Sequence, residues 1–296
     1  MIHFEYIAKR GIKMYKIGLS SCGKVLNEEL FYNYSKSGLS SIEISPDPSE
    51  YKNLDYKSLA KFSRKHNVEL WSYHLPFAPF EEIEPSSLDI ELRAKTIGYF
   101  TDLINKASDI GINKFIIHPS GEPNDEIIRE EKIKCAKDSL NKLVEIAAQH
   151  NSIICVENLP RSCLGNSSSE INALISVHDK LRVCFDTNHL LGESNVEFIK
   201  NVGDKIVTLH VSDYDFINER HWLPGEGKIN WNDILDALKK AKYNGVWMYE
   251  VGLKCPKTII RSRDLNCGDF AANAKALFDG KTPAIFSTPK SNLGIW

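Results

Sequence analysis

The sequence predicts an α/β fold of the (β/α)₈ type, a TIM barrel, and three observations support this prediction. Short β-rich runs alternate along the chain with segments of helical apolar spacing. The β-rich runs number eight, and several of them are apolar at almost every position. Alternation of strand and helix requires a parallel sheet with crossover helices, and the count of eight favours a closed barrel over a doubly wound sheet.

The predicted strands are short runs of aliphatic, β-branched and aromatic residues. Runs such as KFIIHP and SIICVEN have the composition expected when the barrel interior covers one face of a strand and helices cover the other. The eight runs span residues 16–20, 41–45, 68–75, 114–119, 153–158, 181–189, 206–213 and 245–252.

The segments between the strands have the periodicity of helices. In residues 90–110, Ile97, Phe100 and Ile104 belong to an apolar series with spacings of three and four, and residues 135–148 repeat the pattern. Such segments are the crossover helices that a parallel barrel requires.

The length and composition suit a single domain over residues 1–296. The chain is 42% hydrophobic and 26% charged, which gives one large core and is close to the usual barrel size. The barrel itself is predicted at about residues 16–278. The tail at residues 281–296 lacks periodicity and could lie across the barrel or against a second copy of the chain, so a homo-oligomer stays open.

Charge and cysteine content narrow the class of protein. Lys and Arg total 37 against 39 Asp and Glu, a net charge of −2, which argues against nucleic acid as a partner. The seven cysteines are scattered without a CxxC pair, as expected for reduced thiols in the cytoplasm. No apolar run reaches the ~20 residues of a spanning helix, and residues 1–14 are too broken for a signal peptide, so we expect a soluble protein without a membrane partner.

Metal-capable side chains stand where the predicted strands end or soon after. Because active sites of (β/α)₈ barrels lie at the C-terminal ends of the strands, these side chains are expected to converge. Five of the nine histidines belong to the set, which comprises His74, His118, Glu157, Asp186, His189, His210, His221 and Glu250.

Each of these residues taken alone also has an ordinary structural explanation. Glu157 or Glu250 could anchor a loop. His74 could be a core histidine bonded to the backbone, and His118 could help to close its turn. Together, however, carboxylates and imidazoles on four successive strands would be costly to bury without a cation or mutual pairing, so we favour a functional site.

The chemistry of the donors indicates the ion. Two Glu, one Asp and one His offer oxygen and nitrogen ligands, which suit Mn²⁺ best, with Co²⁺, Mg²⁺ and Zn²⁺ as alternatives. A carboxylate-rich shell leaves room for two substrate oxygens on the same ion, which then acts as template and Lewis acid. A vicinal diol or a hydroxy-ketone fits that requirement.

Several motifs together resemble a known family. Over residues 16–278 the sequence is similar to the xylose isomerase-like barrel superfamily, whose members include sugar isomerases and epimerases and apurinic-site nucleases of the endonuclease IV type. The motifs that carry the resemblance are VEN at 156–158, CFDTNH at 184–189, LHVSD at 209–213, RHWLPGEGKINW at 220–231 and YE at 249–250.

Resemblance to the ketose 3-epimerase branch implies a role for each residue. It implies that Glu157 and Glu250 act as acid and base, and that His189 and a residue at Arg220 or His221 hold substrate hydroxyls. We add His74 and His118 to these candidate substrate contacts. The resemblance further implies one divalent ion, bound by Glu157, Asp186, His210 and Glu250.

The nuclease branch is the alternative. Its members hold three zinc ions, and this chain has suitable residues at the matching positions. It departs from that pattern at Glu219, where the nucleases have Asp, and in the HLPFAPF segment that begins at His74. No loop rich in Lys or Arg follows the strands to grip a DNA backbone, so the sugar branch is favoured.

The expected activity is isomerisation or epimerisation of a ketose or sugar phosphate through a metal-stabilised enediolate. One carboxylate removes a proton beside the carbonyl, and another returns it. Lys254 and Lys257 follow the last strand without a glycine-rich phosphate cradle, which favours an unphosphorylated substrate. A dehydratase or lyase with the same intermediate, and a metal-binding barrel without catalysis, stay open.

Overall fold

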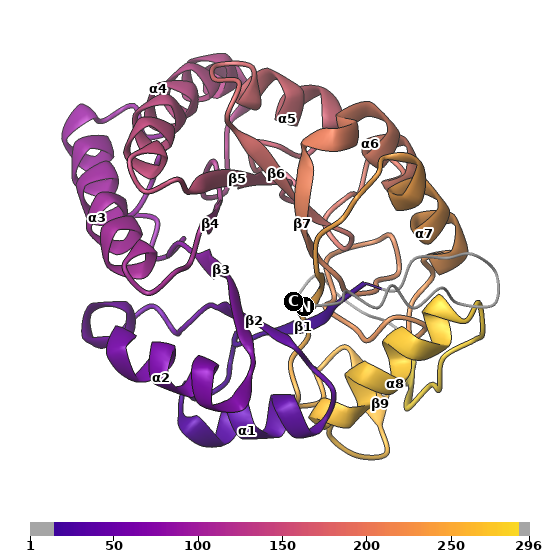
Figure 1. The fold of residues 1–296 in the computed structure, drawn as a ribbon. Coiled ribbons are helices and arrows are strands. Elements are labelled where there is room, and N and C mark those ends of the chain that lie inside the picture. The colour runs from indigo at the N-terminus through magenta and orange to yellow at the C-terminus, as the bar shows by residue number, and fades with distance from the viewer. Residues whose placement is uncertain (1–14, 290–296) are drawn as a thin grey trace.

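The computed structural model describes residues 15–289 and confirms the predicted barrel. Eight parallel strands alternate with helices, and the helices form a ring outside the strands (Figure 1). Each strand falls within one of the eight predicted runs. In chain order they are β1 (Ile17–Ser20), β2 (Ser41–Ile44), β3 (Glu69–His74), β4 (Lys114–Ile117), β5 (Ile153–Glu157), β6 (Arg182–Asp186), β7 (Ile206–His210) and β8 (Trp247–Tyr249).

Backbone hydrogen bonds link each strand to its neighbours around the barrel. Strands β1 to β7 pair in chain order, and β8 pairs with β1. Between β7 and β8, the N–H of Val211 donates to the carbonyl of Met248 at 2.8 Å, and the N–H of Glu250 donates to the carbonyl of Val211 at 3.2 Å. The carboxyl ends of all eight strands therefore open at the same end of the barrel.

The crossover helices begin at side chains that cap them. Asn27, Asp89 and Ser194 each accept a hydrogen bond from the first turn of the following helix, which satisfies N–H groups that lack a partner inside it. The helices are α1 (Glu28–Lys36), α2 (Tyr56–His66), α3 (Ile90–Ser108), α4 (Arg129–Ala148), α5 (Ser168–Ile175), α6 (Asn195–Val202), α7 (Trp231–Lys240) and α8 (Cys267–Phe278). Helix α4 begins six residues before the predicted 135, because its first turns are mostly polar and carry little periodic signal.

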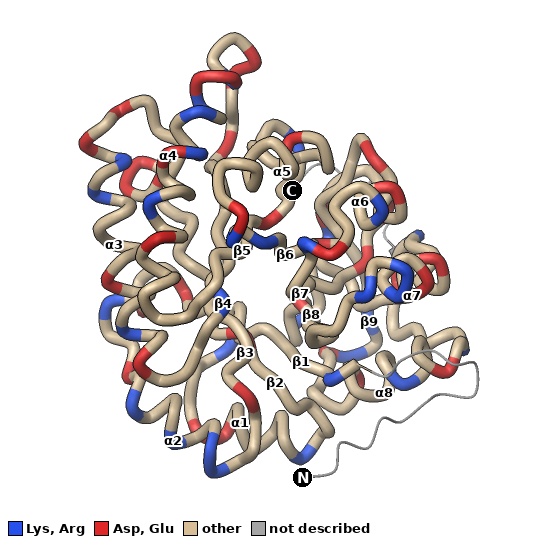
Figure 2. The backbone as a smooth tube through the Cα atoms, turned by 45° about the horizontal axis from the view of Figure 1, so that its top comes forward, with Lys and Arg blue, Asp and Glu red and all other residues tan. Residues whose placement is uncertain are grey.

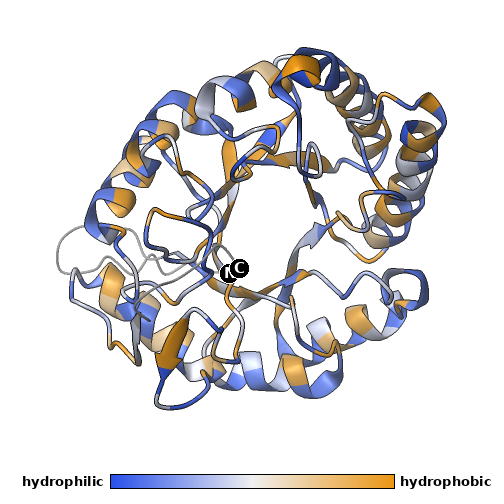
Figure 3. Cartoon of the chain, turned by 180° about the vertical axis from the view of Figure 1, so that it is seen from behind, coloured by the Kyte–Doolittle hydropathy of each residue, from blue (hydrophilic) through white to orange (hydrophobic). Residues whose placement is uncertain are grey.

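The hydrophobic core lies between the strands and the helices that surround them. Phe100 of α3, Leu143 of α4 and Leu235 of α7 are almost fully buried. Figure 3 shows hydrophobic and hydrophilic residues together on these helices, as expected when one side of each helix packs against the barrel. This packing gives the strand ends a rigid base.

The structure describes part of the predicted tail. Strand β10 (Ser287–Pro289) pairs antiparallel with β9 (Ile259–Arg261), so this part of the tail lies against the segment that follows β8. The remainder of the tail, and the expectation that residues 1–14 contain no signal peptide, fall outside the described residues. Within residues 15–289, no helix has the length and apolar character needed to cross a membrane.

Candidate metal centre

The predicted strand-end side chains lie together at one end of the barrel. Six of the eight line a cavity of about 390 Å³, and the other two, Asp186 and His210, are fully buried beside Glu157. Four strands end on a residue of the set, and β4 and β8 are each followed directly by one. These six positions are His74, His118, Glu157, Asp186, His210 and Glu250.

One group of donors has the composition that the sequence predicts for a metal site. Glu157, Asp186, His210 and Glu250 each offer one ligand atom, and these atoms all lie within 4.8 Å of one another. Ligand bonds of about 2.0–2.2 Å place ligand atoms roughly 3–4 Å apart around a shared ion, so small side-chain rotations would complete such a site.

Asp186 provides the clearest sign that this group suits a cation. Its Oδ1 accepts a hydrogen bond of 2.5 Å from the backbone N–H of Asn188. Its Oδ2 is buried and has no hydrogen-bond partner among the described residues. Burial raises the pKa of the Asp186 carboxyl well above its ordinary value. Because an unsatisfied buried oxygen is costly and a divalent ion would satisfy it, the donor set fits the predicted ion.

His210 is held between two carboxylates. Its Nδ1 lies 2.8 Å from Oε1 of Glu157, and its Nε2 lies 3.0 Å from both carboxylate oxygens of Glu43. Burial opposes a positive charge on the ring, but the acidic groups around it raise the pKa of His210 well above its ordinary value. An Nε2–H that donates to Glu43 leaves Nδ1 as the nitrogen that faces the metal group.

Glu43 is a site residue that the sequence analysis did not identify. It is fully buried in β2, and its Oε2 also accepts a hydrogen bond of 2.7 Å from the Ser72 hydroxyl. The predicted site residues are polar side chains at the strand ends, whereas Glu43 stands inside its strand between Ile42 and Ile44. A single carboxylate between two isoleucines inside a predicted strand is the signal that could have identified it.

Substitution Glu43→Gln is expected to lower the affinity for Mn²⁺ by about 10–100-fold without unfolding the protein. Partners of this kind orient the ligating ring and raise its basicity, and their loss typically has that effect. Calorimetric titration of the metal-free protein with Mn²⁺ measures the change. Glu69→Gln, an exposed position at the start of β3, is the matched control. Unchanged Mn²⁺ affinity in Glu43→Gln would show that Glu43 serves folding alone.

Glu157 connects this group to two further histidines. Its Oε2 lies 3.2 Å from Nε2 of His74 and 3.1 Å from Nε2 of His118. Although burial raises the pKa of Glu157, the charges of His210 and His118 outweigh it and hold the pKa well below its ordinary value. His74, His118 and Glu157 thus form a second compact set of donors.

A third set, formed by His189, Glu219 and His221, lies next to the four-donor group: Nδ1 of His189 is 3.7 Å from Oε1 of Glu157. Nε2 of His189 lies 3.2 Å from Oε2 of Glu219. Nδ1 of His189 is 2.9 Å from the carbonyl oxygen of Asn158, and Nδ1 of His221 is 3.2 Å from that of Glu250. With Nδ1 donating to these carbonyls, Nε2 of His189 is directed at Glu219, and Nε2 of His221 can bind a ligand.

The structure does not bring Arg220 to the cavity with the other predicted substrate contacts. Its side chain is buried, and Nε donates to Asp215 at 3.0 Å. Its backbone N–H donates to Oδ1 of Asn188 at 2.8 Å, which fixes the loop that carries His221. Arg220 is not among the residues that line the cavity, whereas the adjacent His221 is. The structure thus gives Arg220 a contact with Asp215, and its role as a substrate contact stays a prediction.

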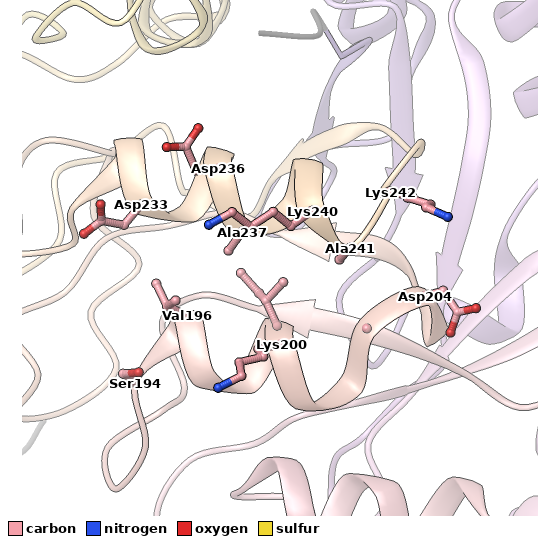
Figure 4. A pocket seen from close by; sticks show the side chains of 12 residues that line it. Ser194, Val196, Lys200, Asp204, Asp233, Asp236, Ala237, Lys240, Ala241 and Lys242 are labelled. Carbon is pink, nitrogen blue, oxygen red and sulfur yellow. The ribbon is translucent and has the colours of Figure 1, made fainter.

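A larger hollow, of about 840 Å³, lies on the outside of the barrel. It is bounded by residues such as Lys200 from α6 and Asp236 and Lys240 from α7 (Figure 4). No histidine or cysteine lines it, and none of the metal-capable groups found in residues 15–289 lies there. The candidate site is therefore the cavity at the strand ends.

Comparison with known families agrees with this architecture. Residues 31–262 match the family described as xylose isomerase-like TIM barrel. The chain belongs to this family.

The proteins that this chain resembles differ in the activities that their names state. The chain is 28% identical to an uncharacterized protein of Methanocaldococcus jannaschii, over 66% of this chain and 68% of the relative. It is 27% identical to a probable endonuclease 4 of Thermoplasma acidophilum (60% and 67% covered) and 24% identical to a D-psicose 3-epimerase of Ruminiclostridium cellulolyticum (76% and 78%). Among solved structures, a D-tagatose 3-epimerase-like protein is similar with a TM-score of 0.67 and 25% identity, over 79% of this chain and 89% of that one.

Proposed function

We propose that the chain is a divalent-metal-dependent sugar isomerase or epimerase that acts on a ketose through an enediolate. The observation that carries this proposal is the group of four donors in which the buried Oδ2 of Asp186 lacks a hydrogen-bond partner among the described residues. The similarity to sugar epimerases supports the same chemistry. We expect Mn²⁺ as the resident ion, with Co²⁺, Mg²⁺ or Zn²⁺ as alternatives.

The residues of the cavity can divide the work of proton transfer between them. A divalent ion held by the four donors would supply Lewis-acid chemistry that makes the C–H beside a carbonyl more acidic. Glu250, whose side chain is 14% exposed, removes that proton. Glu157, which comes from the strand end three strands away, first takes up a proton from His74, whose Nε2 lies 3.2 Å from its Oε2. It then delivers this proton to the opposite face, which inverts the carbon. Return of the proton to the neighbouring carbon gives isomerisation instead.

Other residues of the wall suit a sugar. His221 can bond a hydroxyl through Nε2, and His189 can do so together with Glu219, whose Oε2 lies 3.2 Å from its Nε2. Phe77, which stacks on His118, and Phe80 line the same cavity. An aromatic ring packs well against the apolar face of a sugar. The buried Tyr214 and Trp222 take no part, because their polar atoms bond to Leu190 and Thr258 within the loops.

Deuterium exchange tests the proposal directly. Ketoses are incubated with the Mn²⁺-loaded protein in D₂O, and NMR is used to locate deuterium on carbon. We expect deuterium on a carbon next to the carbonyl, and we expect the epimer or the aldose isomer to form as the product. If no ketose exchanges with Mn²⁺, Co²⁺, Mg²⁺ or Zn²⁺, the proposal is wrong. Formation of a dehydration product would keep the enediolate and replace the isomerase assignment.

An apurinic-site nuclease is the second candidate, because several overlapping sets of metal-capable side chains lie at the strand ends and endonuclease 4 proteins are similar to this chain. Charge weighs against it: Figure 2 shows Lys and Arg interspersed with Asp and Glu along the outer helices, without a basic face in that view. We expect little or no nicking of duplex DNA with an abasic site at physiological salt. Robust metal-dependent nicking would favour the nuclease.

A further inference from the structure

Arg161 lies on the cavity wall in an uncommon conformation. It belongs to the loop after β5, and its φ of 51° is in the left-handed region that residues other than glycine rarely adopt. The Asn166 side chain donates to the Arg161 carbonyl oxygen at 2.8 Å and helps to hold this backbone in place. Residues held in sparsely populated backbone conformations are concentrated at functional sites.

The guanidinium of Arg161 is bound by two other loops. Nε donates to Glu122 at 2.9 Å, and Nη2 bonds to the other oxygen of the same carboxylate. From the loop after β7, Asn218 accepts from Nη1 at 2.7 Å and Glu219 accepts from Nη2 at 2.9 Å. Four bonds thus engage a group that has five N–H donors, and the side chain is still 28% exposed.

The charges of the cavity wall would repel a phosphate. Among the residues described, 15–289, Arg161 is the only Lys or Arg that lines the cavity, and both Glu122 and Glu219 neutralise it. Lys254 and Lys257 are exposed and do not line the cavity. A phosphate ester would therefore meet carboxylates and an Arg whose charge is already compensated.

A sugar hydroxyl suits the same surface. It donates one hydrogen bond and accepts others, so it can bond both to the remaining Nη1–H of Arg161 and to a lone pair of Glu122 or Glu219. Glu219 also contacts His189, which places this surface next to the metal centre on one side of the cavity. A substrate bound at the metal centre would therefore extend its far hydroxyls toward Arg161.

From this arrangement we infer that Arg161, held by Glu122 and Glu219, is a specificity-determining residue that binds the far hydroxyls of an uncharged polyhydroxy substrate and excludes its phosphate ester. The inference rests on the proposed function, because it takes the substrate to be a sugar. The resulting selectivity is built from the two carboxylates that prevent Arg161 from serving as a phosphate ligand.

Calorimetry with matched ligands tests this inference. D-Fructose and D-fructose 6-phosphate, and other ketoses with their terminal phosphates, are titrated into the full-length Mn²⁺-loaded protein. We expect the uncharged sugar to bind at least tenfold more tightly than its phosphate. Arg161→Met should weaken binding of the uncharged sugar about tenfold and leave Mn²⁺ affinity unchanged, because Arg161 touches none of the four metal donors. Arg161→Lys, which keeps the charge but not the planar fork, should restore little of the affinity.

Glu122→Gln is the second variant, and it keeps the size of the side chain if Arg161→Met fails to fold. Loss of one carboxylate should reduce the ratio of affinities, uncharged sugar over phosphate ester, about tenfold. Arg263→Met, which removes a similar pair with Asp269 outside the cavity, should leave the preference unchanged. The inference is overturned if the wild type binds the phosphate ester as tightly as the sugar or more tightly, or if it binds neither ligand. It is also overturned if Arg161→Met keeps the wild-type sugar affinity and Glu122→Gln keeps the wild-type preference.

Deuterium exchange is read in the same samples, so the two proposals can fail separately. Exchange without the expected ranking of ligands would leave the isomerase or epimerase standing and remove the subsite. The expected ranking without exchange would leave the subsite standing and remove the proposed reaction.

Discussion

Substitution of Glu250 by Gln is expected to lower turnover and deuterium exchange by about 10²–10⁴-fold, the range that general acid–base catalysis typically contributes. Gln keeps the size of the side chain and a carbonyl oxygen that can bind the ion, but it cannot accept the substrate's proton. The position is suited to the role, because Glu250 lines the cavity and the charges of His210 and His221 outweigh burial and lower its pKa to about 2. It is therefore ionised at neutral pH, as a base must be.

The matching variant Glu157→Gln separates the two roles. If Glu157 returns the proton, Glu157→Gln should abolish formation of the epimer and retain some exchange of the proton that Glu250 removes. Rates of exchange and of epimer formation, measured by NMR on one sample, distinguish these steps. Glu145→Gln, an exposed position on α4, is the control. Near wild-type epimerisation by either cavity variant would place the acid or base elsewhere.

The barrel and its strand-end residues could be predicted because their signals are local. A buried parallel strand is a short apolar run, and the first polar residue at its end marks the carboxyl edge of the sheet. His74, Glu157, Asp186 and His210 each stand at such a point, and each is the last residue of its strand in the structure. Because the topology of the barrel brings the carboxyl ends of its strands together, residues at these ends can also be predicted to lie close to one another.

The remaining features of the site depend on contacts between distant parts of the chain. Glu43 acts on His210, which is 167 residues away, and the interval contains nothing that would pair them. Arg161 is defined by carboxylates from two other loops, and its backbone conformation is not visible in the sequence. For the adjacent Arg220 and His221, loop geometry alone decides which side chain reaches the cavity.

The second large effect is expected at Asp186. Substitution Asp186→Ala should reduce retained divalent metal from about one equivalent or more to a small fraction of that amount, because it removes the donor whose buried Oδ2 has no hydrogen-bond partner among the described residues. Elemental analysis of the purified wild type and variant measures the difference. Equal metal content in the two proteins would refute the four-donor site.

Thermal unfolding gives an independent measurement of the same site. Metal that binds only the folded protein stabilises it by about 4 kcal/mol at a concentration 1,000 times Kd. Added Mn²⁺ should therefore raise the melting temperature of the wild type much more than that of Asp186→Asn, which keeps one oxygen donor but loses the negative charge. Without metal, the melting temperature of Asp186→Asn should be equal to or higher than that of the wild type. The wild type buries a carboxyl oxygen that has no hydrogen-bond partner among the described residues, and burial raises the pKa of that group. Asn is uncharged and offers an N–H to the carboxylates of Glu157 and Glu250. If Asp186→Asn is at least as stable as the wild type without metal and responds little to added Mn²⁺, Asp186 serves ion binding at the expense of folding stability. If the metal-free variant is much less stable than the metal-free wild type, Asp186 is a structural residue.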